Sequence, residues 1–157
     1  MEKSEFVYVT YIRTTPEKLW QALIAPEFTK RYWKETWQES EWKVGSSWRL
    51  KSPDMHDVFS GEVLEIEPPR RLVLTWRNEM KPDIRAEGYS RLTYELEKQG
   101  ESVKFTIIHE IDKRDSKIIQ DVSGGWPLIL ASLKSLLETG KPLEETRTWQ
   151  MGGCKPS

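Results

Sequence analysis

Residues 123–140 read SGGWPLILASLKSLLETG. Apolar side chains recur there at three- and four-residue spacing, which lines one side of a helix. These are Trp126, Ile129, Leu130, Leu133, Leu136 and Leu137. Pro127 is tolerated only in the first turn of a helix, and Gly140 suits a left-handed C-terminal cap before Pro142. We therefore predict a bounded helix that begins near Trp126, follows a flexible Ser-Gly-Gly segment and packs against an apolar surface.

The composition indicates one domain with no strong charge. The chain has 157 residues, with 24 basic and 25 acidic side chains and a net charge of -1. This balance argues against the phosphate-driven affinity on which nucleic-acid binding depends. No repeat or linker composition interrupts the sequence, so we predict a single domain over residues 1–150 and a flexible C-terminal tail over residues 151–157.

Cysteine usage and the distribution of apolar residues predict the cellular compartment of the protein. Cys154 is the only cysteine and cannot form an internal disulfide. The first residues, MEKS, lack an apolar signal region, and no apolar run approaches the ~20 residues that cross a bilayer. We expect a cytoplasmic protein without membrane insertion.

The N-terminal third predicts one strand and two helices. Residues 6–12 are β-branched and aromatic, which is typical of a strand, and the Thr-Thr-Pro-Glu sequence at 14–17 marks a helix start. The apolar residues that follow share one helical face and stop before Pro26. Residues 27–32 then predict a second short helix.

Between Trp37 and Glu110 the sequence period changes to two. Apolar and polar residues alternate, and glycine or proline turns separate the alternating runs. These turns lie near residues 44–47, 68–71 and 99–101. We predict six antiparallel strands here, the element order β-α-α-β-β-β-β-β-β-α, and an α+β fold in which a curved sheet of six to seven strands wraps around the C-terminal helix.

Tryptophan is unusually frequent, and the excess suggests an aromatic cavity between sheet and helix. The eight tryptophans stand at positions 20, 33, 37, 42, 48, 76, 126 and 149. The positions of Trp33, Trp48, Trp76 and Trp126 allow them either to meet in such a cavity or to fill core volume, whereas Trp20 fits an ordinary core position. Cavities of this kind are mostly apolar with a few polar groups.

Three sequence blocks resemble a known family. TPEKLWQAL at 15–23, GEVLEIEPPRRLVLTW at 61–76 and the segment at 125–140 occur in the order and spacing of the bacterial branch related to the activator of the ninety-kilodalton heat-shock protein's ATPase. That branch belongs to the helix-grip superfamily of START lipid-transfer domains, birch-pollen-type proteins and polyketide cyclases. The resemblance implies a helix-grip fold that hosts lipid carriers, hormone binders, cyclases and co-chaperones alike.

His109 is the one candidate for chemistry. Residues 103–111 alternate as a strand, so His109 faces the same side as Phe105, toward the sheet–helix space. There it would hydrogen-bond a ligand carbonyl or act as an acid or base, or it would be a core histidine with all its hydrogen bonds made. His56 lies in a polar loop and is expected to be solvated.

Other chemistries lack their sequence signals. Two histidines far apart and one tail cysteine do not have metal-ligand spacing, and no Gly-x-Ser-x-Gly nucleophile motif occurs. We predict no metal site and no cofactor. The sequence leaves catalysis open and favours binding without it.

The function predicted from these features is binding of a small hydrophobic or aromatic, lipid- or polyketide-like ligand between sheet and helix. The expected ligand-binding residues are Trp33, Trp48, Trp76, Tyr94, Phe105, His109, Trp126 and Leu130. One alternative is a cyclase or hydrolase that uses His109. Another is a co-chaperone-like module that uses the charged outer face of the sheet, which we favour less because mixed exposed charges are ordinary. A homodimer formed through an unpaired edge strand also stays open.

Overall fold

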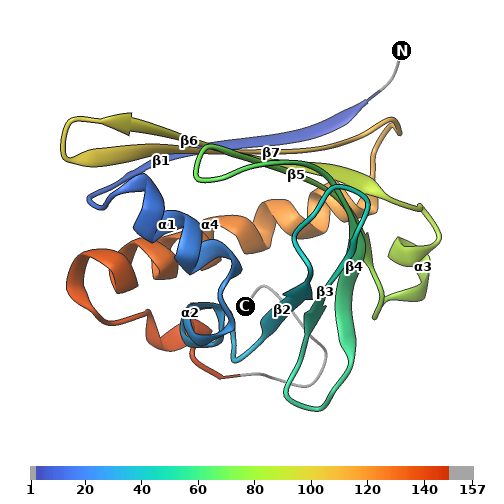
Figure 1. Cartoon of the computed structure of the whole chain (residues 1–157). Helices are drawn as coiled ribbons and strands as arrows, with labels where there is room; N and C mark the ends of the chain where they lie inside the picture. Colours follow the sequence, from blue (N-terminus) through green and yellow to red (C-terminus); the bar gives the residue numbers. More distant parts are fainter. Residues whose placement is uncertain (1–2, 149–157) are drawn as a thin grey trace.

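The computed structural model describes residues 3–148 and confirms the predicted order of elements (Figure 1). The elements are β1 (Ser4–Ile12), α1 (Pro16–Ile24), α2 (Pro26–Tyr32), β2 (Trp37–Ser40), β3 (Ser47–Lys51), β4 (Asp57–Glu67), β5 (Arg71–Asn78), α3 (Pro82–Arg85), β6 (Ser90–Gln99), β7 (Ser102–Ile111), α4 (Lys117–Thr139) and a 3₁₀ turn (Glu144–Thr146). The sequence analysis did not predict the short α3 or the 3₁₀ turn. The predicted tail at 151–157, Trp149 and Cys154 lie outside the described residues.

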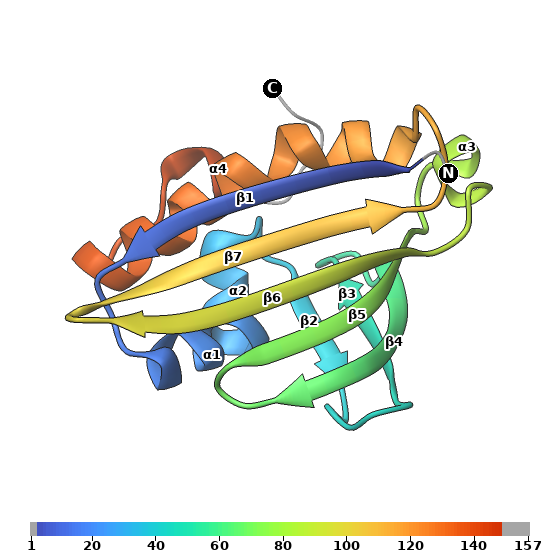
Figure 2. The same cartoon turned by 90° about the horizontal axis from the view of Figure 1, so that it is seen from above.

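Seven strands form one antiparallel sheet in the order β1-β7-β6-β5-β4-β3-β2 (Figure 2). The sheet is curved, and α1, α2 and α4 lie on its inner side (Figure 1). Along β6 and β7, buried and more exposed residues alternate, which matches the predicted period of two. The chain therefore has the predicted α+β helix-grip architecture. Among the described residues, no helix combines the length and apolar character needed to span a bilayer.

The sheet bends where β5, β4 and β3 follow one another (Figure 1). The strand register shifts between Leu50 and Lys51 and again between Val63 and Glu65, and such irregularities bend and twist a sheet. Gly61 lies between these shifts, and a Cβ atom there would stand 1.8 Å from the carbonyl oxygen of Thr75. Only glycine fits this close approach of the two backbones.

Helix α4 starts earlier than predicted, at Lys117 instead of near Trp126. Pro127 and both glycines of the expected flexible segment therefore lie inside the helix, and the prediction of a first-turn proline was wrong. An interior proline costs about 3 kcal/mol because its ring removes one backbone hydrogen bond. Burial of Ile118, Ile119 and Val122 offsets that cost, since each apolar side chain of this size contributes about 1.5–3 kcal/mol. At the other end, Gly140 has the predicted left-handed conformation, with φ of 86°.

The N-terminus of α4 is capped by two side chains. Ser116 Oγ accepts a hydrogen bond from the backbone N–H of Ile119 at 3.3 Å. Glu87, from the connection between α3 and β6, accepts from the N–H groups of Lys117 at 2.8 Å and Ile118 at 3.2 Å. Burial alone would raise the pKa of the Glu87 carboxyl, but these hydrogen bonds and one from Ser116 hold it below its ordinary value. The carboxylate thus fixes the start of α4 relative to the sheet.

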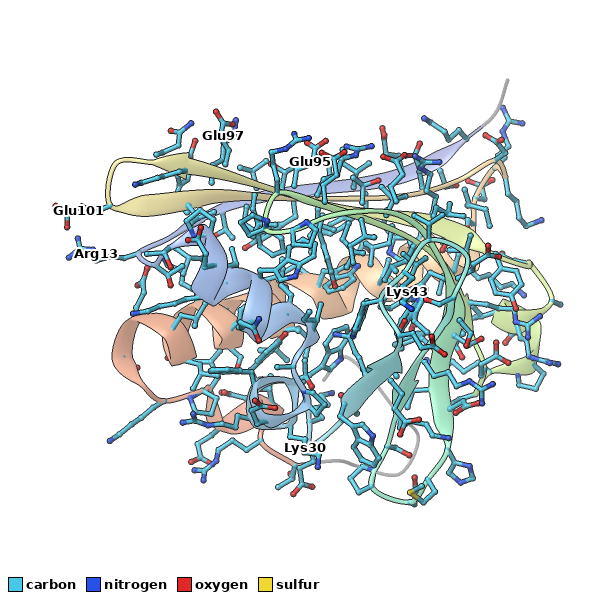
Figure 3. The ribbon with its side chains drawn as sticks, viewed as in Figure 1. Arg13, Lys30, Lys43, Glu95, Glu97 and Glu101 are labelled. Carbon is cyan, nitrogen blue, oxygen red and sulfur yellow. The ribbon has the colours of Figure 1, made fainter. Side chains whose placement is uncertain are left out.

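The outer face of the sheet carries charged side chains that pair with one another. Glu95 and Glu97 point away from the helices (Figure 3). Arg71 bonds both Glu65 at 3.0 Å and Glu95 at 2.5 Å, while Arg91 reaches Glu65 at 3.3 Å. These are partly exposed pairs of the kind that contribute little to stability.

Candidate functional site

An aromatic cluster fills the space between the sheet and the N-terminal half of α4. Trp76 of β5 lies at its centre, with ring centroids 4.9 Å from Trp48, 4.6 Å from Phe59 and 5.5 Å from Trp126 of α4. Trp33, which follows α2, lies 6.2 Å from Trp76 and 5.4 Å from Trp126. Strand, helix and loop thus bring together four tryptophans that the sequence analysis placed in one cavity.

A narrow crevice of about 30 Å³ opens beside this cluster. Its lining residues are Trp33, Phe59, Trp76, Asp121, Val122, Gly125, Trp126 and Ile129. The volume accommodates about one water molecule, so large side chains occupy most of the predicted cavity in this conformation. Its wall toward α4 is formed by the stretch Asp121–Ile129 of that helix, which includes Gly125.

Two of the clustered indoles have no hydrogen-bond partner. Trp33 Nε1 and Trp76 Nε1 are the buried side-chain nitrogens without a partner among the described residues. Trp33 is 4 % exposed and Trp76 is 1 % exposed. Trp48 differs from them, because its Nε1 donates to the carbonyl oxygen of Thr75 at 2.9 Å. A buried donor without a partner costs about 1–3 kcal/mol, so the two free N–H groups are an exception in the fold.

His109 lies beneath the cluster and is held by a chain of hydrogen bonds. Trp126 Nε1 donates to His109 Nδ1 at 3.1 Å. Since an indole nitrogen can only donate, Nδ1 carries no proton and Nε2 does. Nε2 therefore donates to Ser90 Oγ at 2.7 Å, and that hydroxyl donates to the carbonyl oxygen of Trp76 at 3.1 Å. Both nitrogens of His109, the Trp126 indole and the Ser90 hydroxyl thus all have partners.

The environment of His109 keeps its ring neutral. The side chain is 0 % exposed, and this burial lowers the pKa of His109 to about 3. Burial likewise raises the pKa of the Tyr94 hydroxyl above its ordinary value. Both groups keep one protonation state across the neutral range. The arrangement corresponds to the core histidine that the sequence analysis considered beside a reactive one.

All eight predicted site residues are buried, but they divide into two groups. Trp33, Trp76 and Trp126 line the crevice. The remaining five contact the cluster or the core behind it without lining the crevice, and these are Trp48, Tyr94, Phe105, His109 and Leu130.

The sequence analysis missed two groups of residues at the site. Val122 and Asp121 lie in the part of α4 that was not predicted to be helical, although Ile118, Ile119, Val122 and Trp126 have helical spacing. That spacing, with Ser116 ahead of it, was the signal available in the sequence. Phe59 and Ser90 were missed because pairing across strands places them, and a single sequence does not show that pairing.

A metal centre has no support in the described part of the chain. Between residues 3 and 148, no group of three or more histidine, cysteine, aspartate or glutamate side chains lies close enough together to hold an ion.

Several solved structures share this fold at low sequence identity. The solution structure of CalU16 from Micromonospora echinospora is 20% identical with a TM-score of 0.72, covering 98% of this chain and 76% of its own. The Aha1 dimer from Colwellia psychrerythraea is 19% identical with a TM-score of 0.70, covering 88% and 98%. An HSP90 activator from Plasmodium falciparum is 20% identical with a TM-score of 0.64, covering 78% and 86%. At these identities the likeness shows the fold alone.

Sequence comparison assigns the family. No curated protein matches the chain at a significant level. The sequence model of the family described as "Activator of Hsp90 ATPase homolog 1-like protein" matches residues 13–138, which run from the end of β1 almost to the end of α4. That match spans most of the 157 residues and covers the blocks at 15–23 and 61–76 and residues 125–138 of the third block. The chain therefore belongs to the activator of Hsp90 ATPase homolog 1-like family.

Proposed function

We propose that the protein binds a small hydrophobic or aromatic molecule between the sheet and α4, without covalent chemistry of its own. The observation that carries the proposal is the crevice at Trp33, Trp76 and Trp126, an aromatic hollow at the sheet–helix interface. Ligand sites are typically concave and mostly apolar with few polar groups, and this crevice has that composition.

Binding of a molecule larger than water requires the crevice to widen, and α4 is weakest beside it. Pro127 has no N–H to bond the carbonyl oxygen of Ser123, and Gly124 and Gly125 have low helix propensity. The helix therefore loses little when this stretch shifts. Val122 and Ile129, on either side of it, would follow the movement, since both line the crevice.

Tryptophan fluorescence measures this binding directly. Titration of the purified chain with lipids and planar polyphenols should quench the emission of the clustered tryptophans and raise the melting temperature. Quenching should saturate as the proposed site fills. If no compound alters either the fluorescence or the melting temperature, the proposed function is wrong.

The adjacent glycines of α4 provide a matched pair of variants. Gly125 lines the crevice and Gly124 is exposed. Gly125→Leu should fill the crevice and abolish saturable quenching, whereas Gly124→Leu should leave it intact. Equal loss in both variants would show that ligands bind elsewhere or that the helix is disrupted, and circular dichroism separates those two results.

A cyclase or hydrolase that uses His109 is not supported as the function. Both ring nitrogens already bond Trp126 and Ser90, so neither is available to a substrate in this arrangement. A group with a pKa of about 3 is also a poor acid or base near neutral pH. If His109→Ala abolished a turnover that the folded protein performs, this judgement would have to be reversed.

A second candidate is association of two copies through β1. This edge strand exposes three apolar side chains in a row on its outer face, Val7 at 52 %, Val9 at 44 % and Tyr11 at 49 %. Exposed apolar side chains on an edge strand favour association with a second copy. The relative from Colwellia psychrerythraea is described as a dimer, which is consistent with this proposal. Light scattering should give a dimer mass that Val7→Lys with Val9→Lys reduces to a monomer mass; a monomer in the unmodified protein would exclude it.

A co-chaperone role is supported by the family and by the HSP90 activator among the fold relatives. The outer face proposed for it has its charges engaged in pairs, including Arg71 with Glu95 and Arg91 with Glu65. Recovery of a chaperone in stoichiometric amount with the tagged protein would favour this role over ligand binding.

A further inference from the structure

The two unpartnered indoles constrain the chemistry of the ligand. Trp33 Nε1 and Trp76 Nε1 are donors, and both side chains line the crevice. We infer that the crevice binds a neutral, planar molecule with a carbonyl-type oxygen, which accepts hydrogen bonds from these two N–H groups. The inference rests on the proposed function and specifies its ligand class.

Three other indole N–H groups of the described residues have hydrogen-bond partners. Trp48 Nε1 donates to Thr75, Trp126 Nε1 to His109 and Trp37 Nε1 to Glu39 at 2.9 Å. The exceptions therefore concentrate at one place, beside the hollow. A buried donor gains most from an acceptor that arrives from outside the protein, because water no longer competes for it.

The charges around the crevice favour a neutral ligand. Among the described residues that line the crevice, the charged one is Asp121, whose carboxylate pairs with Lys81 Nζ at 3.1 Å. A fatty-acid carboxylate would lie near Asp121 with no lining cation to compensate its charge, and burial of an unpaired charge is costly. A neutral carbonyl avoids both penalties.

The walls of the crevice favour a flat ligand. The rings of Trp33 and Trp76 stack on each other at an interplanar angle of 17°, and Trp126 is tilted by 59° against Trp33, so aromatic faces and edges border the crevice. Aromatic rings bind other flat rings by offset stacking or edge contacts. Together with the two donors, these walls specify an aromatic ketone or quinone-like compound over a flexible acyl chain.

Three matched probes test the inference by isothermal titration calorimetry on the whole chain. They share a naphthalene ring: 2-acetylnaphthalene has a neutral acceptor, 2-ethylnaphthalene has none, and 2-naphthoate has a charged one. We expect the ketone to bind about tenfold more tightly than the ethyl compound, and naphthoate to bind most weakly. Equal affinity for the ketone and the ethyl compound would overturn the inference.

Tryptophan variants locate the effect. Trp33→Phe and Trp76→Phe keep an aromatic ring but remove the donor, so each should reduce the preference for the ketone several-fold while the ethyl compound is little affected. Trp37→Phe is the control, since that indole bonds Glu39 and does not line the crevice. The same loss of preference in the control would contradict the assignment.

Nuclear magnetic resonance gives a second result that needs no stable variant at the crevice. In the unmodified protein, the indole N–H resonances of Trp33 and Trp76 should move downfield with the ketone and not with the ethyl compound. If both probes bind and neither moves these resonances, water or nothing bonds the donors and the inference fails while ligand binding stands. If no probe binds, the proposed function fails as well.

Discussion

The two halves of α4 lie on the same sheet but form different interiors. The C-terminal half lies under the end of the sheet that carries the β6–β7 turn (Figures 1 and 2), where Ile12, Phe105 and Leu133 are completely buried in an apolar core. The N-terminal half lies over the tryptophans, the crevice and both free indole donors. The difference shows that one helix packs against an apolar core along one half and borders a crevice along the other.

The largest expected effect comes from the packed half. Phe105→Ala removes a fully buried ring whose centroid lies 5.5 Å from that of Tyr94. The substitution should lower the free energy of unfolding by about 3–5 kcal/mol. Urea unfolding measures the change. Ligand affinity of the protein that remains folded should be unaffected. A loss below about 1 kcal/mol would mean that this end is as adaptable as the crevice end.

The next effect is the pH dependence set by His109, at the boundary between the halves. Its pKa is about 3 in the folded protein against an ordinary 6.5, so the unfolded chain takes up a proton first as the pH falls. The stability that this residue contributes is complete above pH 6.5 and is lost between pH 6.5 and about 3. The loss should reach about 2 kcal/mol at pH 5, measured by urea unfolding.

A variant assigns that pH dependence to His109. His109→Asn removes the titrating group and keeps an acceptor for Trp126, so it should lower stability at neutral pH but flatten the slope between pH 6.5 and 5. Glu79 does not contribute to this slope, because burial raises its pKa less than hydrogen bonds from Arg77, Ser60 and Arg85 lower it, to about 2. An unchanged slope would place the titrating group elsewhere.

A smaller difference in unfolding free energy is expected between replacing an indole whose N–H is hydrogen-bonded and replacing one whose N–H has no partner. Trp48→Phe and Trp33→Phe shorten the aromatic side chain equally, but Trp48→Phe also leaves the Thr75 carbonyl without this donor, whereas Trp33→Phe removes a donor that had no partner. The first should therefore cost about 1 kcal/mol more than the second in thermal or urea unfolding. If Trp33→Phe is the more costly change, its N–H has a partner, and the contrast between the indoles disappears.

The smallest expected effect has the opposite sign. Gly125→Ala should raise the free energy of unfolding by about 0.5–1 kcal/mol, because alanine favours a helix and its Cβ would meet no atom within 4 Å. The methyl group should also narrow the crevice and weaken ligand binding. Destabilisation would show that this stretch of α4 requires the flexibility of glycine for folding itself.

Elements with a strong local pattern were predicted correctly. The alternation at residues 103–111 placed His109 and Phe105 on the inner face, and Gly140 ended α4 as expected. The start of α4 was not predicted, because Pro127 argues locally against a helix interior. Burial of Ile118 and Val122 against the rest of the protein outweighs that local preference.

The sequence by itself determined the order of elements, the faces of the strands, the C-terminal cap of α4 and the family, because these depend on periodicity and on residues near one another in the chain. Only the tertiary structure decided that tryptophans from β5, α4 and the α2–β2 connection meet, that His109 is fully bonded, and that Trp33 and Trp76 keep free donors. Hydrogen-bond partners of buried groups come from distant segments, so their presence or absence is settled by packing and not by local sequence.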